Sequence, residues 1–184
     1  MRESILEANR KILEMANQQP ALSGMGTTLT ALKVWMDGGR FAVGHVGDSR
    51  AYLLSGDEFR QLSRDHTMVR DMVDAGRIPA SAEREHPLGH ILSRALGTES
   101  RVEVDLVEGS VSDGDCFMLC SDGLMKVMTE EEVESWVRQV RTRTLEELVD
   151  AMVSEANRRG APDNVTVALL AVRADTGNRE AGHA

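Results

Sequence analysis

Hydrophobic residues near the start of the chain recur at helical spacing, and later ones alternate with polar residues as they do in strands. In the segment 4–17 they fall every three or four positions, and Ser4 with Glu7 has the spacing of a capping box, so we expect a helix there. The alternating pattern then predicts strands at 27–35, 40–46, 51–54 and 59–62. Tight, glycine-containing turns at 37–39 and 55–57 predict an antiparallel meander rather than a βαβ unit.

The stretch 63–97 differs from its surroundings because it is polar and interrupted by prolines, with one short helical segment from Thr67 to Ala75. Long connections in compact domains are more often functional than incidental, so we interpret this stretch as a flap beside the sheet. Beyond it the pattern predicts strands at 102–108, 115–121 and 165–172, and helices that begin at the capping boxes Thr129/Glu132 and Thr144/Glu147. We find no internal repeat or linker, so we expect one domain over residues 1–172 and a polar tail at 173–184.

Strands in two blocks, with helices before and between them, predict an α+β fold. Two packed antiparallel sheets with helices outside them, a four-layer αββα sandwich, would bury both faces of the strands. Cys116 and Cys120 lie in one apolar strand at an even spacing and therefore share a face. We expect both to be buried small residues in a reducing compartment rather than ligands or a disulfide.

The charge of the chain limits its partners. Thirty acidic and 21 basic residues give a formal net charge of −9, and we find no Lys/Arg cluster of the kind that nucleic-acid binding requires. No apolar run approaches the ~20 residues that span a bilayer, and the first residues lack the apolar region of a secretory signal. We therefore expect a cytoplasmic protein that binds neither nucleic acid nor membrane.

Three acidic residues share one local setting, each beside Gly or Asn where a predicted strand pauses or stops. They are Asp48, Asp122 and Asp163. Strand-end carboxylates that project into one cleft are ligands that Mg²⁺ and Mn²⁺ prefer, and such ions bind phosphate oxygens and activate water. Taken alone, each Asp has a simpler explanation, because Asp-Gly and Asp-Asn are also common turn dipeptides.

The ordered combination of motifs is more specific than any one of them. In chain order, the sequence contains Gly24-Met-Gly-Thr-Thr-Leu29, Val46-Gly-Asp-Ser-Arg-Ala-Tyr52, Leu62-Ser-Arg-Asp-His66, His86-Pro87, Ser93-Arg-Ala-Leu-Gly97, Asp115-Cys-Phe-Met-Leu-Cys-Ser-Asp-Gly-Leu124 and Gly160-Ala-Pro-Asp-Asn-Val-Thr-Val167. This series resembles the PPM-type (type 2C) metal-dependent Ser/Thr protein phosphatases from about Ile5 to Val172.

The resemblance implies a fold, an activity and a set of site residues. The fold would be the same two-sheet sandwich, and the activity would be hydrolysis of phosphoserine or phosphothreonine by a metal-activated water. Asp122 and Asp163 would bind two Mn²⁺ or Mg²⁺ ions, and Asp48 with Asp122 would bind a third. The flap at 63–97 would influence substrate access. Residues at flap or substrate positions are Arg64, His66, His86 and Arg94; residues that shape the site are Gly47, Gly123 and Asn164.

One part of the family pattern is not found. We see no Arg-x-x-Asn-x-Asp stretch and no Asp-Gly-Met-Gly-Gly-type turn before Gly24, and these segments supply the carboxylate that bridges the two metal ions. We therefore expect an N-terminally incomplete domain with impaired activity. A late start or truncated record is the favoured explanation; a degenerate domain and a fragment completed by another chain are the alternatives.

The rival function is a pseudophosphatase, a binding or regulatory module that keeps the fold without hydrolysis. The retention of Asp48, Asp122 and Asp163 argues against it. The histidines are not assigned as general acids: His45 lies within a predicted strand and is expected to be packed, and His183 lies in the tail. The expected partners are phosphorylated proteins and, by family analogy, a cognate Ser/Thr kinase.

Overall fold

Two antiparallel sheets lie face to face at the centre of the computed structural model, which describes residues 1–84 and 86–174. The first sheet has the strand order β1-β2-β5, with β1 at Leu29–Trp35, β2 at Arg40–Val46 and β5 at Asp105–Ser110. The second sheet has the order β4-β3-β6-β7, with β3 at Arg50–Ser55, β4 at Glu58–Gln61, β6 at Cys116–Cys120 and β7 at Val167–Ala171. All strand pairs are antiparallel.

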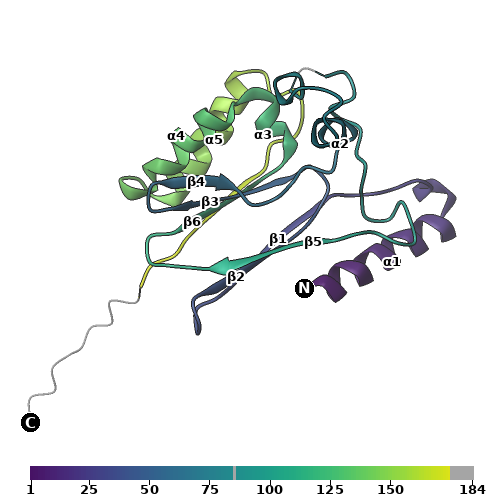
Figure 1. Ribbon diagram of the computed structural model, residues 1–184, viewed down its shortest axis with the longest axis horizontal. Coiled ribbons are helices and arrows are strands. Elements are labelled where there is room, and N and C mark those ends of the chain that lie inside the picture. Colours follow the sequence, from purple (N-terminus) through teal and green to yellow (C-terminus); the bar gives the residue numbers. More distant parts are fainter. Residues whose placement is uncertain (85, 175–184) are drawn as a thin grey trace, which may run out of the picture.

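Helices cover the outer faces of both sheets (Figure 1). Helix α1 (Arg2–Gln18) packs on the first sheet; α3 (Asp122–Val127), α4 (Glu130–Val137) and α5 (Leu145–Arg158) pack on the second. The short helix α2 (Met68–Asp74) and a 3-10 turn at Ala80–Ala82 lie in the 63–97 segment. Two more 3-10 turns span Pro20–Leu22 and Arg138–Arg141. The predicted α+β sandwich with outer helices is confirmed.

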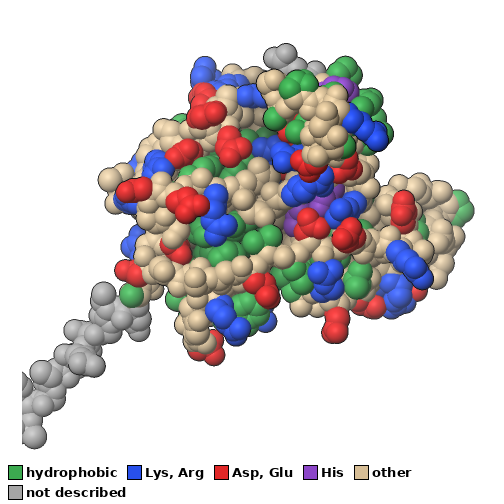
Figure 2. Space-filling view, in the orientation of Figure 1, with side chains coloured by type: hydrophobic (Ala, Val, Ile, Leu, Met, Phe, Trp, Pro, Cys, Tyr) green, Lys and Arg blue, Asp and Glu red, His purple; other side chains and the backbone are tan. Residues whose placement is uncertain are grey.

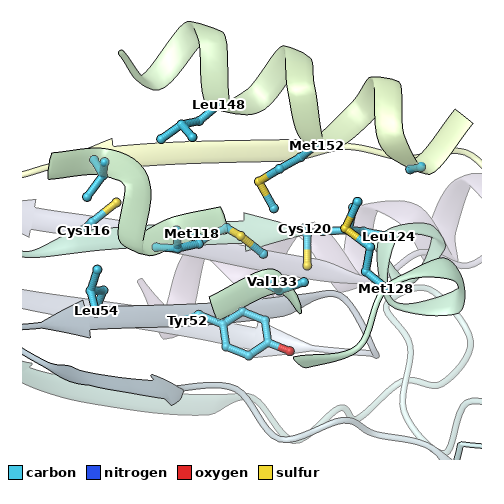
Figure 3. Close-up of a cluster of buried hydrophobic side chains, with 13 residues drawn as sticks. Tyr52, Leu54, Cys116, Met118, Cys120, Leu124, Met128, Val133, Leu148 and Met152 are labelled. Carbon is cyan, nitrogen blue, oxygen red and sulfur yellow. The ribbon is translucent and has the colours of Figure 1, made fainter. Parts of the chain in front are cut away.

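Three hydrophobic clusters fill the three interfaces between these layers. The largest lies between the second sheet and its helices, where Tyr52, Met118 and Met152 are fully buried (Figure 3). The second lies between the sheets and includes Phe41 and Phe117, whose rings meet edge to face at 5.0 Å. The third and smallest joins α1 to the first sheet. The alternation of the strands explains this division, because successive residues of β3 and β6 point to opposite faces of the second sheet.

Several boundaries and one connection differ from the sequence predictions. The strands do not form one meander: β2 and β3 are consecutive but lie in different sheets, so the chain crosses from one sheet to the other at the turn between them. Alternation alone could not show this, because it records which residues are buried but not against which sheet. The predicted capping box at Ser4 is also wrong, since α1 begins at Arg2 without a side-chain cap. The boxes at Thr129 and Thr144 are both confirmed.

Two further expectations concern the cysteines and the end of the chain. Cys116 and Cys120 are free, buried and in the same hydrophobic cluster, as predicted. Of the predicted polar tail at 173–184, residues 175–184, with His183, lie outside the described residues. None of the helices in the described part of the chain combines the length and the apolar character needed to cross a bilayer.

Candidate metal and phosphate site

The first part of the site is the turn that carries Asp48, immediately after β2. Gly47 has a φ of +116°, and a Cβ placed on it would come within 2.4 Å of the Thr28 side chain, so glycine is required there. His66 forms hydrogen bonds with both the N–H and the carbonyl group of this glycine. The Gly47 N–H donates to His66 Nδ1 at 3.1 Å, and the His66 backbone N–H donates to the Gly47 carbonyl at 2.7 Å. The turn is therefore fixed by sterics and by hydrogen bonds to the 63–97 segment.

A partly buried network extends from His66. Because Nδ1 accepts from a backbone N–H, the proton of the neutral ring is on Nε2, which donates to Asp105 Oδ2 at 3.1 Å. Arg94 Nη1 donates to the other oxygen of Asp105 at 2.9 Å. Burial lowers the pKa of His66 below its ordinary value, so the ring is neutral near pH 7. His45, also buried, lies beside it with a ring-centroid distance of 4.8 Å and donates to the Arg64 carbonyl.

Asp48 itself projects into an acidic environment. Burial, followed by repulsion from Asp122 and Asp65, raises the pKa of the Asp48 carboxyl to about 6. A carboxylate that is destabilised by neighbouring negative charge gains from an added cation. This electrostatic setting therefore favours a positive charge near Asp48 and Asp122.

The second part of the site brings Asp122 and Asp163 together from distant positions in the sequence. Asp122 is the first residue of α3, and Asp163 lies in the loop before β7. A Cβ on Gly123 would come within 2.3 Å of the Asn164 carbonyl oxygen, so the absence of a side chain at 123 lets α3 approach this loop. Ser121 fastens the two segments, because its hydroxyl donates to the Asn164 carbonyl and accepts from the Thr166 N–H.

One ammonium group lies between these two carboxylates. Lys126 Nζ is 2.6 Å from Asp122 Oδ2 and 2.6 Å from Asp163 Oδ2. The hydrogen bond from Lys126 holds the pKa of Asp163 below its ordinary value. Although burial acts to lower the pKa of Lys126, its bonds to the two carboxylates raise it overall, so both ions keep their charge at neutral pH. The two oxygens are close enough to share one small cation.

A cleft of about 440 Å³ joins the two parts of the site and is bounded by the 63–97 segment and by α3. Asp48, Asp122 and Lys126 line it, and Asp163 does not. Arg50 and Asp65 form a bidentate ion pair on the wall of the cleft, with Arg50 Nη2 2.7 Å from Asp65 Oδ2. The cleft presents both signs of charge, because Arg50 and Lys126 line it together with Asp48, Asp65 and Asp122. On the surface between α1 and α2, outside the cleft, Figure 2 shows acidic and basic side chains crowded around histidine.

The structure separates the four residues predicted for the flap and substrate. His86 lines the cleft. Arg64 instead pairs with Asp71 and Asp74 on α2, at 2.7 and 2.6 Å. His66 and Arg94 belong to the partly buried network behind Asp48 rather than to the cleft wall.

Sequence reasoning missed four residues that shape the site. Lys126 stands four residues after Asp122, the spacing of a helical ion pair, and this signal was available. Arg50 and Asp65 lie within the quoted motifs, but nothing in the sequence shows that they pair across 15 positions. The Asp105 contact with His66 had no local signal.

The donor set can be compared with what a divalent ion requires. Mg²⁺ and Mn²⁺ take a few carboxylate oxygens and complete their shell with water and substrate oxygens. Asp122 and Asp163 already converge on one cation, and Asp48 faces the same cleft, so these oxygens fit one side of such a site. Within residues 1–84 and 86–174, no group of three His, Cys, Asp or Glu side chains is placed to hold one ion.

Comparison with known proteins identifies the family. The model of the family described as protein phosphatase 2C matches residues 1–165. The chain belongs to the protein phosphatase 2C family. It is 39% identical over 170 residues to the Listeria innocua serine/threonine phosphatase stp, and the match covers 92% of this chain and 66% of that protein. The chain therefore spans about two thirds of the length of this relative.

Solved structures of protein phosphatase 2C relatives agree with the fold. The crystal structure of the serine/threonine phosphatase Stp1 from Staphylococcus aureus matches with a TM-score of 0.85 at 29% identity, covering 94% of this chain and 66% of that one. The catalytic domain of the serine threonine protein phosphatase PstP, in complex with 2 manganese ions, matches with a TM-score of 0.75 at 35% identity, covering 88% and 64%. The αββα sandwich is thus the family fold.

Proposed function

We propose that this chain carries most of a metal-dependent phosphatase that hydrolyses phosphoserine and phosphothreonine in proteins. Its family and the names of its relatives support the reaction class. The substrates would be phosphorylated proteins in the cytoplasm, with a Ser/Thr kinase supplying them. The chain spans only about two thirds of the Listeria relative, so the activity is proposed for the completed domain.

The observation that carries this proposal is the convergence of Asp122 and Asp163 on one cation at the edge of the cleft. These two carboxylates, with Asp48, would hold Mn²⁺ or Mg²⁺: two ions in the complete domain, and a third that Asp48 shares with Asp122. When bound, such ions polarise phosphate oxygens and lower the pKa of coordinated water. A relative of 35% identity in complex with manganese supports this cofactor assignment.

The residues of this chain would perform three tasks around the phosphate. Asp122 and Asp163 supply negative charge that fixes the cations, and the His66 network holds the Asp48 turn in place. The 63–97 segment, through His86, forms a wall of the cleft and would limit which phosphopeptides enter. The Arg50–Asp65 pair keeps that wall rigid because both partners are largely buried.

The test is Mn²⁺-dependent hydrolysis of p-nitrophenyl phosphate and of a phosphothreonine peptide. It compares the 184-residue chain with a version completed by the N-terminal segment of a relative, and each with its Asp163→Ala variant. We expect turnover by the completed protein, loss of at least about 100-fold with Asp163→Ala, and little or no turnover by the chain alone. An inert completed protein, or an active Asp163→Ala variant, would refute the site assignment.

A specific observation favours a second candidate, the pseudophosphatase. Lys126 already supplies one positive charge to the Asp122–Asp163 pair, and the described residues offer no third donor there. A module that binds phosphoproteins without hydrolysing them needs no divalent ion at this place. Binding of the phosphothreonine peptide by the completed protein, unaffected by Mn²⁺ and without release of phosphate, would identify this function.

A further inference from the structure

Lys126 is placed to do more than make a surface ion pair. Its helical position, four residues after Asp122, accounts for the first contact, because residues at that spacing lie on the same face of a helix. The second contact, to Asp163, reaches a loop 37 positions away in the sequence. One ammonium group thus closes the gap between two segments at the point where their carboxylates converge.

This placement conflicts with occupation of the same oxygens by a divalent ion. An ammonium group has three donors and no lone pair, so it cannot share a coordination shell. A divalent ion that takes Asp122 Oδ2 and Asp163 Oδ2 must displace Lys126 Nζ from both. Lys126 is about one third exposed, and its long flexible stem allows the ammonium group to move into the adjoining cleft.

We propose that Lys126 is an internal cation that holds Asp122 and Asp163 together until a divalent ion replaces it, and that it thereby sets the metal concentration at which the site fills. This inference rests on the metal-binding role proposed above. Without Lys126 the two carboxylates would repel one another, and a divalent ion would meet no competitor. The charge of Lys126, rather than its bulk, is the determining property.

The first experiment is a Mn²⁺ titration of the full chain, with free Mn²⁺ measured by its electron paramagnetic resonance signal. Lys126→Met removes the charge and keeps most of the side-chain volume, and Lys126→Arg keeps the charge. Lys11→Met, on the exposed face of α1 beside Glu7, is the control for loss of a surface lysine. We expect Lys126→Met to bind Mn²⁺ about tenfold more tightly, the size expected for two exposed ion pairs, and the other two variants to resemble the wild type.

Thermal unfolding provides a readout that a merely structural lysine would not give. In chelator, Lys126→Met should melt below the wild type because Asp122 and Asp163 are left unscreened. Saturating Mn²⁺ should then raise its melting temperature by more than it raises that of the wild type. A purely structural role predicts the same Mn²⁺ increment in both proteins, and that result would overturn the proposal.

Chemical labelling of the unmutated chain keeps the proposal testable even if Lys126→Met does not fold. An acetylating reagent followed by mass spectrometry should modify Lys126 slowly in chelator and several times faster with Mn²⁺, while Lys11 should react equally in both. Equal rates at Lys126, equal Mn²⁺ affinity in Lys126→Met, tightening by Lys126→Arg, or no Mn²⁺ binding by any of these proteins would each overturn it. None of these readouts is hydrolysis, so an inert completed enzyme would refute the proposed function and leave this inference standing.

Discussion

The two parts of the acidic site are held in place by different physical means. The Asp48 turn depends on a glycine that no other residue can replace and on His66, a fully buried side chain whose ring and backbone both bond to Gly47. The Asp122–Asp163 pair depends on Lys126, and all three side chains are at least one third exposed. The side chains of the first part are held by buried contacts, whereas the two carboxylates of the second part, on segments joined through Ser121, are bridged by an exposed and replaceable charge.

This difference separates stability from cation binding. Buried hydrogen bonds and steric fit contribute strongly to the free energy of unfolding, whereas exposed ion pairs contribute little. Changes at the Asp48 turn should therefore unfold the protein, while changes at the Asp122–Asp163 pair should chiefly alter what it binds.

The largest effect is expected for Gly47→Ala. The added Cβ would lie 2.4 Å from Thr28 Cγ2, and a φ of +116° is strained for alanine, so we expect a loss of about 3 to 5 kcal/mol in the free energy of unfolding. Gly56→Ala is the matched control, because its φ is also positive at +55° but nothing lies within 4 Å of the new Cβ. It should cost only about 1 to 2 kcal/mol. Urea unfolding of both variants measures the difference, and equal losses would contradict a tightly packed turn.

His66→Gln should have the next largest effect. The substitution removes the ring that bonds to the buried Gly47 N–H and to the partly exposed Asp105 carboxylate, so we expect a loss of about 2 to 3 kcal/mol. His86→Gln is the control, because His86 Nδ1 accepts from Leu88 N–H within one half-exposed turn. It should change the free energy of unfolding by less than about 1 kcal/mol. Similar losses at the two histidines would mean that the partly buried network is not what holds the turn.

Gly123→Ala tests the other part of the site and should cost less. Its Cβ would lie 2.3 Å from the Asn164 carbonyl oxygen, but the exposed loop can move, and alanine favours the helix, so we expect a loss of about 1 to 2 kcal/mol. The shift should separate Asp163 from Asp122 and weaken Mn²⁺ binding, which calorimetry of the same preparation measures. Full Mn²⁺ affinity in a destabilised Gly123→Ala variant would show that the Asp122–Asp163 distance is unimportant.

The fold was easier to predict than the site, for a physical reason. Periodicity located the strands because burial of one face of a sheet makes hydrophobic and polar residues alternate in the sequence. The strand β2 was predicted with its observed bounds, Arg40–Val46. The ordered motifs placed Asp48, Asp122 and Asp163 near one another because the sandwich brings strand ends together. The contacts made by His66 and Asp105 join positions 39 apart and depend on side-chain geometry, for which a single sequence holds no signal.

The β2–β3 crossover and the role of Lys126 were missed for similar reasons. Alternation gives the same pattern whether two strands share a sheet or face one another across a core. Lys126 has the spacing of an ordinary helical ion pair, and only the folded loop shows that Asp163 is its second partner.

The smallest effect is expected from a change of pH on the free energy of unfolding. It should originate in the buried groups around the Asp48 turn and not in the Asp122–Asp163 pair. Burial lowers the pKa of His66 below 6.5, although the bond to Asp105 opposes this shift and limits its size. As the pH falls below about 6.5, the unfolded chain takes up a proton that the native ring does not, so stability decreases. His45, whose pKa burial also lowers, adds a contribution of the same sign.

The protonation of Asp48 changes stability in the opposite direction, so the measurement is made in proteins that carry Asp48→Asn. With its pKa raised to about 6, the native carboxyl binds a proton before the unfolded one does, which adds stability as the pH falls through 6. The comparison is therefore between Asp48→Asn and Asp48→Asn/His66→Gln, by urea unfolding from pH 7.5 to pH 5.5. The single variant should lose more stability over this range than the double variant, which keeps only the His45 contribution.

The Lys126–Asp163 pair should contribute nothing, because the pKa of Lys126 is raised and that of Asp163 is lowered, so both stay charged throughout. Equal slopes in the two variants would show that His66 takes up its proton over the same pH range in the native and the unfolded protein, and the expected effect of burial on its pKa would then be wrong.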